Sequence, residues 1–375
     1  MKIVLNEIKK IFELKMIAIM LLINFILYFL FTSFHINHFP NGRPELDHYN
    51  IHLEMLENYG RDMDEEEFAH FKEVYENEVE RANQYLQEDE LAREEGISTY
   101  EAFRSIGSDR LGSYIMFEER VDLFWELQAR ESLIDDYETT DLFIERLYEK
   151  SNEQQRQRID EVVHEDRLSS IFPNLVFNNY TDYIGEVCLA IFLSIMFMLS
   201  PIYLRDGKNN MNDLQYTSKI GRNLFKKKAL GAIIATFIII TLELGVYFLI
   251  YTKNNTGMFL NSKIISIFHK RIFWYNLTFI QYIVLTLVGI YVMGFVIALM
   301  VSLISSLAPN YIATIAIQIP LVFFTLVVFI PYLIKYIALV NLPKYSRGIS
   351  YLGLVIVSLI LMGIRWRREK LMDIA

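Results

Sequence analysis

Residues 187–230, "VCLAIFLSIMFMLSPIYLRDGKNNMNDLQYTSKIGRNLFKKKAL", decide how this chain of 375 residues is organised. They begin with an uncharged apolar run, pass through a loop with seven basic and two acidic residues, and end at the start of a second apolar run. A bilayer core about 30 Å thick needs about 20 apolar residues to be crossed as an α-helix. The quoted stretch therefore predicts two membrane-spanning helices joined by a short basic loop.

Apolar runs of the same kind recur along the chain. The 63 residues 272–334 contain no Asp, Glu, Lys or Arg, which is enough for two spans. Pro309 ends a helix and Asn310 favours a turn, so we place the break there. The sequence thus predicts an all-α membrane protein with six spans: 16–34, 184–204, 229–252, 275–304, 311–334 and 349–364.

Lysine and arginine near the ends of spans indicate orientation, because cytoplasmic loops are rich in both. Basic residues gather in 1–15, 205–228 and 365–375, and six spans place all three segments on one side. We therefore expect both termini in the cytoplasm. Segment 1–15 is amphipathic and is expected to lie at the inner membrane surface, or else to extend the first span. Segment 365–375 is expected to form a basic tail.

The remaining loops, 35–183, 253–274 and 335–348, are then expected outside the cell. Residues 34–183 carry 37 acidic and 14 basic side chains, a net charge of −23 within a chain whose total is −9. The single cysteine, Cys188, lies in an apolar run, so no disulfide stabilises this region, which favours a bacterial plasma membrane. The expected outer loop 253–274 departs from the charge rule with four basic residues: Lys253, Lys263, Lys270 and Arg271.

The acidic region has the signals of a small helical bundle. Three capping-box patterns start at Asp64, Ser98 and Ser151. A helical apolar stripe follows the first of them: Phe68, Phe71, Tyr75, Val79, Ala82 and Leu86. We expect about four or five helices in this extracellular domain.

Chemistry in the sequence is sparse. It has no Walker phosphate loop and no G-x-S-x-G motif, which argues against ATP binding or hydrolysis by this chain. His48 and His52 have a metal-like spacing, but we expect no metal site. Glu243 and Asn24 are polar residues inside apolar runs, where a carboxylate is costly. They are candidates for a transport route, with a structural hydrogen bond as the alternative.

The loop motif "LQYTSKIGRNLFKKKAL" and the order of segments resemble permease subunits of ABC-2-type (type V) ABC exporters. The likeness covers nearly the whole chain, and the acidic stretch is similar to that of exporter permeases in Firmicutes-type bacteria. Arg205 and Asp206 stand where the family often has a Glu. The family's loop pattern falls on Leu214, Thr217, Ser218, Gly221, Arg222 and Lys228.

The resemblance implies a transport subunit that is not itself an enzyme and binds no cofactor. Two copies of a cytoplasmic ABC ATPase would use ATP and Mg²⁺, and a second permease, identical or homologous, would complete the route. The substrate would be an amphipathic molecule such as an antimicrobial or other peptide, a drug or a lipid-like compound. Loop 205–228 would enter the ATPase as a coupling helix, through Met211, Leu214, Tyr216, Thr217, Ser218, Gly221 and Arg222.

Membrane lipids are the other expected partner, and no nucleic acid is expected. Basic side chains at helix ends would anchor at anionic headgroups: Lys226, Lys227, Lys228, Arg365, Arg367 and Arg368. The alternative function is a non-transporting membrane sensor, scaffold or immunity component that acts through its acidic outer domain. A sensor usually has a cytoplasmic output domain. The segments expected in the cytoplasm are only about 15, 24 and 11 residues long, given the predicted spans, so they favour transport.

Overall fold

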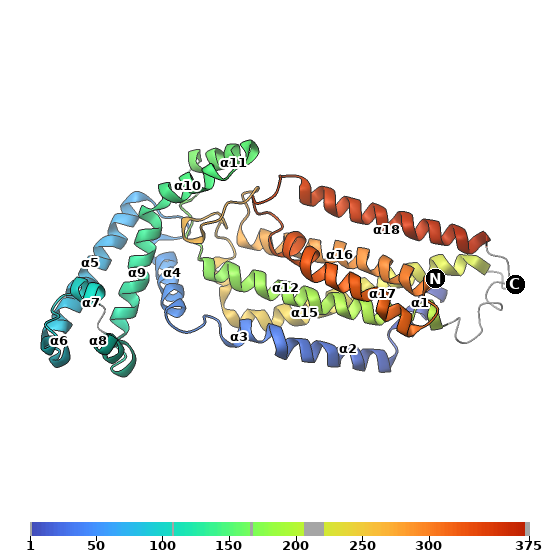
Figure 1. The fold of residues 1–375 in the computed structure, drawn as a ribbon, viewed down its shortest axis with the longest axis horizontal. Helices are drawn as coiled ribbons and strands as arrows, with labels where there is room; N and C mark the ends of the chain where they lie inside the picture. The colour runs from blue at the N-terminus through green and yellow to red at the C-terminus, as the bar shows by residue number, and fades with distance from the viewer. Residues whose placement is uncertain (1, 107–108, 166–167, 206–220, 372–375) are drawn as a thin grey trace. The chain divides into compact units, whose positions relative to one another are not determined.

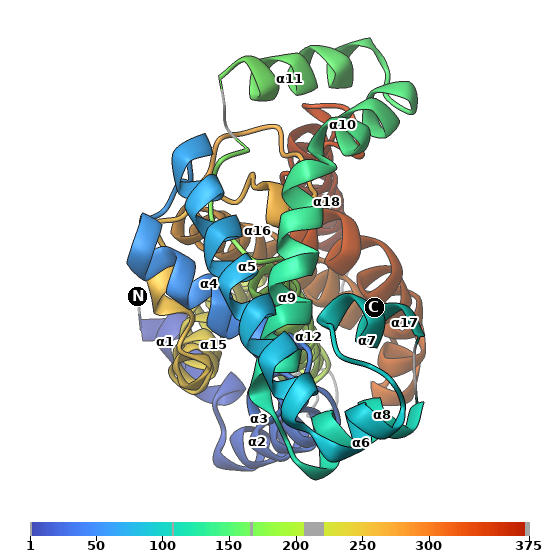
Figure 2. The ribbon, with the colours of Figure 1, turned by 90° about the vertical axis from the view of Figure 1, so that its left-hand side faces the viewer.

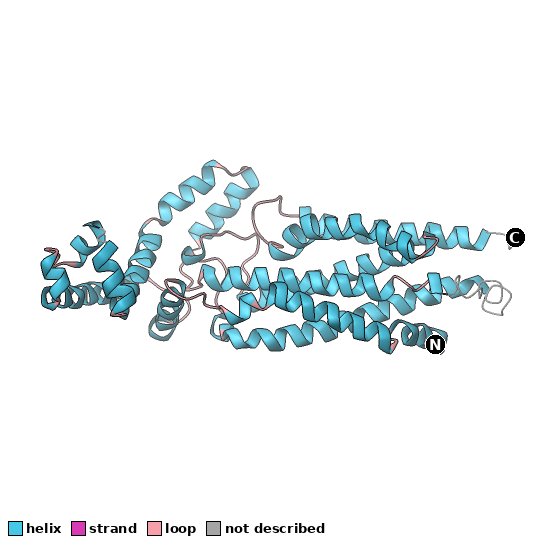
Figure 3. Cartoon of the chain, turned by 60° about the horizontal axis from the view of Figure 1, so that its bottom comes forward, coloured by secondary structure: helices cyan, strands magenta, loops and turns pink. Residues whose placement is uncertain are grey.

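The computed structural model describes residues 2–106, 109–165, 168–205 and 221–371. Across these ranges the regular elements are helices, and β-pairing is limited to isolated bridges (Figure 3). The chain divides into two compact units. The first, called the membrane unit here, is Met1–Asn37, Asn179–Asn255 and Gln281–Ala375, and the second, called the acidic domain, is His38–Asn178 and Thr256–Ile280.

Among the described residues, six helices are long and apolar enough to cross a membrane, so the predicted number of spans is confirmed by length and composition. Their order along the chain can be followed in Figure 1. They are α2 with the π-helix η1 (Leu14–Thr32), α12 (Asn174–Leu199), α15 with η4 (Leu224–Asn254), α16 (Phe279–Leu307), α17 with η7 (Tyr311–Lys335) and α18 (Ser346–Leu371).

Helix ends differ from the predicted ones where polar residues continue a helix. Helix α15 begins at Leu224, so the lysines that follow belong to the helix and not to the loop. Helix α18 continues to Leu371, so the basic segment after residue 364 is largely helical. Asn310 caps α17 by accepting a hydrogen bond from the Ala313 N–H at 2.9 Å, as the predicted break requires.

Helix α12 is the innermost of the six. Of its most apolar window 72% is buried inside the protein, against 17% for α18 and none for α2. A helix that is apolar on every side must be covered on every side or face lipid. Helix α12 is therefore the centre of the membrane unit, and α2 and α18 expose apolar faces such as those of Phe25 and Leu359.

In its described residues the acidic domain contains five α-helices of ten residues or more, as predicted, and three short α-helices that were not. The long helices are α4 (Glu45–Tyr59), α5 (Glu65–Glu88), α9 (Asp122–Glu138), α10 (Thr140–Glu149) and α11 (Glu153–His164). The short ones are α6 (Glu90–Glu94), α7 (Tyr100–Ile106) and α8 (Asp109–Ser113), followed by η2 (Tyr114–Glu118).

Helices α4 and α5 both pack against α9 (Figure 2). The predicted stripe on α5 faces this packing, with Phe71, Ala82 and Leu86 buried. It divides between two hydrophobic clusters, one around Phe71 and Leu133 and one around Leu86 and Phe124. The period of the apolar residues thus identified the core face of the longest helix.

One predicted capping box is confirmed, one forms a residue later, and the third is replaced by a single cap hydrogen bond. The Asp64 carboxylate accepts from the Glu67 N–H, and the Glu67 carboxylate accepts from the Asp64 N–H, both at 2.9 Å. The box expected at Ser151 is formed by Asn152 with Gln155, because Ser151 Oγ donates back to the Leu147 carbonyl at 2.6 Å. Near Ser98, the hydroxyl oxygen of the next residue, Thr99, accepts a hydrogen bond from the Ala102 N–H.

Residues 256–280 belong to the acidic domain, although about 80 residues separate them from its first segment. Lys263 pairs with Asp62 at 2.9 Å, and Lys270 pairs with Asp136. Two of the four basic residues that departed from the charge rule therefore neutralise carboxylates of the domain. The two segments therefore fold together, although two of the candidate spans separate them along the chain.

Candidate functional site

The two polar residues singled out in the spans lie together in the structure. Asn24 on α2 donates through Nδ2 to Glu243 Oε1 on α15 at 3.1 Å and to Ser194 Oγ on α12 at 2.8 Å. Tyr247, one turn along α15, donates its hydroxyl proton to Asn24 Oδ1 at 3.1 Å. These four residues are called the polar cluster below, and they join three spans.

Three residues of the cluster, Ser194, Glu243 and Tyr247, are buried, and Asn24 is half-buried. Ser194 is fully buried and Glu243 is 8% exposed. Glu243 Oε2 is buried and has no hydrogen-bond partner in the described part of the chain, and no ion pair to this carboxyl group is found there. A carboxyl group in such surroundings is costly unless it carries a proton or meets a polar ligand. The cluster therefore offers one unused oxygen, an amide and two hydroxyl groups among apolar helices.

A second layer of polar contacts joins α3 (Phe34–Asn37), the first turns of α12 and the residues just after α15. Asn179 and Asn254 both donate to the His35 carbonyl at 2.9 Å, and Asn254 also donates to Asn179 Oδ1 at 2.9 Å. His35 lies on the short helix α3 (Phe34–Asn37) and contacts Glu186 at 3.1 Å. Sequence reasoning missed this layer, since asparagines near span ends are common and carry no distinguishing pattern.

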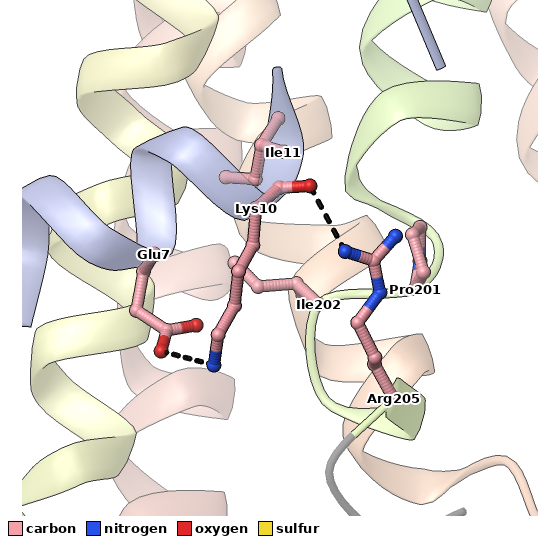
Figure 4. Close-up of a pocket in the computed structure, with 6 residues that line it drawn as sticks. All are labelled: Glu7, Lys10, Ile11, Pro201, Ile202 and Arg205. Atoms are coloured by element: carbon pink, nitrogen blue, oxygen red, sulfur yellow. Dashed lines mark hydrogen bonds and ion pairs between the residues drawn. The ribbon is translucent and has the colours of Figure 1, made fainter. Parts of the chain in front are cut away.

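The predicted coupling loop is bounded by contacts that join its two ends. Before the loop, Tyr203 donates through its hydroxyl group to the Phe225 carbonyl at 3.0 Å, and the two rings lie 4.8 Å apart. After the loop, Lys228 Nζ donates to the Ile202 carbonyl at 3.0 Å. Arg205 reaches helix α1 (Lys2–Ile11), where it donates to the Lys10 carbonyl at 3.1 Å (Figure 4). Arg205 also pairs with Glu13 at 2.8 Å. These contacts are called the loop base below.

Helix α1 (Lys2–Ile11) completes the loop base. It is separate from α2, because Glu13 has extended backbone between them, so the alternative of a continuous first span is wrong. Val4 and Ile11 are buried, and α1 packs along α15. A Cβ on Gly231 would come within 3.3 Å of the Glu7 Cβ, so the glycine allows the close approach.

The predicted coupling residues fall mostly outside the described residues. Met211, Leu214, Tyr216, Thr217 and Ser218 are among the positions for which no structure is described. Gly221 and Arg222 begin the short helix η3 (Gly221–Asn223), where Gly221 has a φ of +49°. A positive φ is readily adopted by glycine, which explains this residue at the end of the loop.

The residues predicted to anchor at lipid headgroups separate into two groups. Lys226, Arg367 and Arg368 are exposed and Lys227 is half-buried, as an anchor requires. Lys228 is 3% exposed, with its ammonium group bound to a backbone carbonyl, so its role is internal and the predicted anchoring is corrected. The guanidinium group of Arg365 is also bound within the protein, since it donates to Ser306 and pairs with Glu369 at 2.9 Å.

The described residues contain no group of three or more His, Cys, Asp or Glu side chains placed to hold a metal ion. His48 and His52 are used within their helix: His52 Nδ1 donates to the His48 carbonyl at 2.7 Å. Burial lowers the pKa of His52 to about 4.

Comparison of the chain with protein-family models, curated proteins and solved structures finds no match.

Proposed function

We propose that this chain is the permease subunit of an ATP-driven ABC exporter, the function that its loop motif and order of segments resemble. One observation of the structure supports it above the others. The loop base holds the α1–α2 junction, the end of α12 and the start of α15, and the polar cluster joins α2, α12 and α15. A push on the loop therefore acts on the same three helices that meet at the cluster.

The coupling follows from this connectivity. A cytoplasmic ATPase that bound loop 205–228 would move the ends of α12 and α15 as one body, because Lys228 and Tyr203 link them. Arg205 would carry the movement to Glu13, the residue from which α2 starts. Small rigid-body shifts of packed helices are a common way to open a route.

Within this proposal the polar cluster lines the route or governs its opening. Glu243 Oε2 is the group that a polar or cationic part of a passing molecule would meet. Two ATPase copies would use ATP and Mg²⁺, and a second permease, identical or homologous, would face the exposed apolar helices. The acidic domain would lie outside the cell, and the substrate would be an amphipathic peptide, drug or lipid-like molecule.

The test is to recover the tagged chain from its native membrane in mild detergent and to identify co-purifying proteins by mass spectrometry. We expect a soluble protein with a Walker loop, lost with Leu214→Asp or Gly221→Trp. Leu371→Asp is the matched control, because Leu371 is 81% exposed and lies at the same expected side. Recovery of the folded chain alone would reject the permease and favour a sensor or scaffold.

A further inference from the structure

The acidic domain carries a cleft that the transport proposal does not use. It encloses about 720 Å³ and is lined by residues from the start of α5, the end of α9, and helices α10 and α11. Figure 2 shows where these helices lie in the fold. Small-molecule sites typically occupy about 300–1,000 Å³. The cleft is thus large enough for several side chains of a bound molecule.

The lining of the cleft has an apolar part. Phe68 and Tyr137 stack with ring centroids 3.7 Å apart and an angle of 15° between their planes. Ile144 and Val163 also line it, and Val163 is 48% exposed. Exposed aliphatic and aromatic groups in a concave site gain free energy when an apolar ligand removes them from water.

The charge of the cleft has one sign. Four exposed carboxylates line it, from Asp64, Glu65, Glu138 and Asp141, and no Lys or Arg is among its described lining residues. Lys72, outside the lining, pairs with Glu138 at 2.5 Å. The two segments of the domain hold 36 acidic and 17 basic residues, a net charge of −19. Such a field draws cations toward the domain.

We propose that this cleft binds a cationic amphipathic peptide. Its apolar side chains contact Phe68, Tyr137 and Val163, while its lysine or arginine groups pair with Glu65 and Asp141. Charge complementarity decides against an anionic or purely apolar ligand, because four carboxylates would then lose water without gaining a partner. The inference goes beyond the proposed function, because this binding requires neither the ATPase nor transport.

Binding is measured with the full chain in nanodiscs of zwitterionic lipid, which exposes both faces and removes the question of sidedness. The probe is a fluorescein-labelled 12-residue peptide of leucine and lysine, and empty nanodiscs provide the background. We expect saturable binding that weakens as salt rises. A peptide with glutamate in place of lysine should not bind, and equal binding of the two peptides would overturn the proposal.

Charge reversal separates the cleft from the general field of the domain. Glu65→Lys with Asp141→Lys is expected to raise the Kd about tenfold or more. Glu73→Lys with Glu76→Lys is the matched control, because both residues are exposed on α5, outside the cleft, and change the net charge equally. An equal loss in both variants would show that the field alone attracts the peptide, and would reject the cleft. Circular dichroism verifies that both variants fold.

Chemical protection locates the peptide directly. The native Cys188 is fully buried, so a thiol reagent reports on an introduced cysteine. Labelling of Val163→Cys should slow at least fivefold when the leucine–lysine peptide saturates the protein. Labelling of Phe117→Cys, at an exposed position of the domain away from the cleft, should not change. Protection of Phe117→Cys alone, or of neither residue, would overturn the assignment.

Discussion

Two buried carboxylates show how differently the two units accommodate charge. Asp47, in the acidic domain, is 2% exposed and lies 3.7 Å from Arg43, one turn earlier. Burial raises the pKa of Asp47, and Arg43 opposes the rise. Glu243, in the membrane unit, is 8% exposed and meets an amide from another helix. Each has one buried oxygen without a hydrogen-bond partner among the described residues.

The difference concerns where the compensation comes from. Asp47 is compensated by a cation four residues away in the chain. Glu243 instead meets a neutral donor from another helix, so its substitution affects more than one span. The hydrogen bonds of the polar cluster therefore connect three helices, so a change in one of its residues affects how these helices pack.

The largest expected effect is the loss of stability of the acidic domain at low pH. Burial lowers the pKa of His52 to about 4 and that of His269 to about 3, against 6.5 when exposed. The unfolded chain therefore binds protons more readily, and the stability present above about pH 6.5 falls as the pH decreases. By pH 5 each histidine should cost on the order of 2 kcal/mol.

Thermal unfolding of the domain between pH 7 and pH 5 checks this. His52→Gln should remove its share of the acid sensitivity. An unchanged pH dependence in His52→Gln would contradict the prediction.

Next in size is the loss of a counter-ion inside the domain. Arg130 is 5% exposed, pairs with Glu54, and has two buried nitrogens without hydrogen-bond partners in the described part of the chain. Glu54→Ala leaves this charge uncompensated and should destabilise the domain by about 3 kcal/mol. Glu78→Ala removes the partner of Arg81, whose side chain is 66% exposed, and should cost less than about 0.5 kcal/mol. Equal costs in urea denaturation would show that Arg130 is well solvated.

Removal of the amide from the polar cluster should have a smaller thermodynamic effect. Asn24→Leu leaves Glu243 and Ser194 without this donor, and hydrogen bonds between membrane helices contribute about 1 kcal/mol. If the permease proposal is right, export should fall much more than stability does. Thr241→Val is the matched control, because it removes a hydrogen bond of 2.8 Å between Thr241 on α15 and Tyr291 on α16, outside the polar cluster. Thermal stability in detergent and export from cells, measured side by side, separate the two effects.

The smallest effect distinguishes surface from buried lysines. Lys226→Gln and Lys227→Gln should each reduce enrichment of anionic lipid about fivefold, since a lysine near an anionic surface contributes about 1 kcal/mol. Lys228→Gln should leave lipid enrichment unchanged and lower the melting temperature, because its ammonium group binds the Ile202 carbonyl. Native mass spectrometry of retained lipids provides the measurement. Loss of lipid with Lys228→Gln would return that residue to the surface group.

The sequence predicted each member of the pair Asn24 and Glu243, because polar groups are conspicuous in apolar runs. It could not predict that they meet, since 219 positions separate them and no local rule specifies which span faces which. Ser194 and Tyr247 gave no signal, because serine and tyrosine are tolerated in spans without a partner that can be named. Their roles appear only when three helices pack.

The same distinction explains the fold. Spans and the stripe on α5 follow from hydrophobic periodicity, which a single segment carries. The capping box expected at Ser151 forms one residue later because Ser151 and Asn152 both begin the same four-residue pattern, and Ser151 Oγ is bonded to the preceding helix. The assignment of residues 256–280 to the acidic domain depends on contacts such as that of Arg158 with the Phe273 carbonyl at 2.9 Å, which no periodicity records.

That division of the acidic domain has a consequence for the time course of synthesis. Residues 256–280 leave the ribosome after the 38–178 segment and after two further spans. Synthesis proceeds at about 5–20 residues per second, so the first segment waits on the order of ten seconds for residues 256–280, which include Lys263 and Ser266. During that interval Ser170, which binds both residues in the finished domain, lacks them. The domain can reach its final form only after the third span has been made.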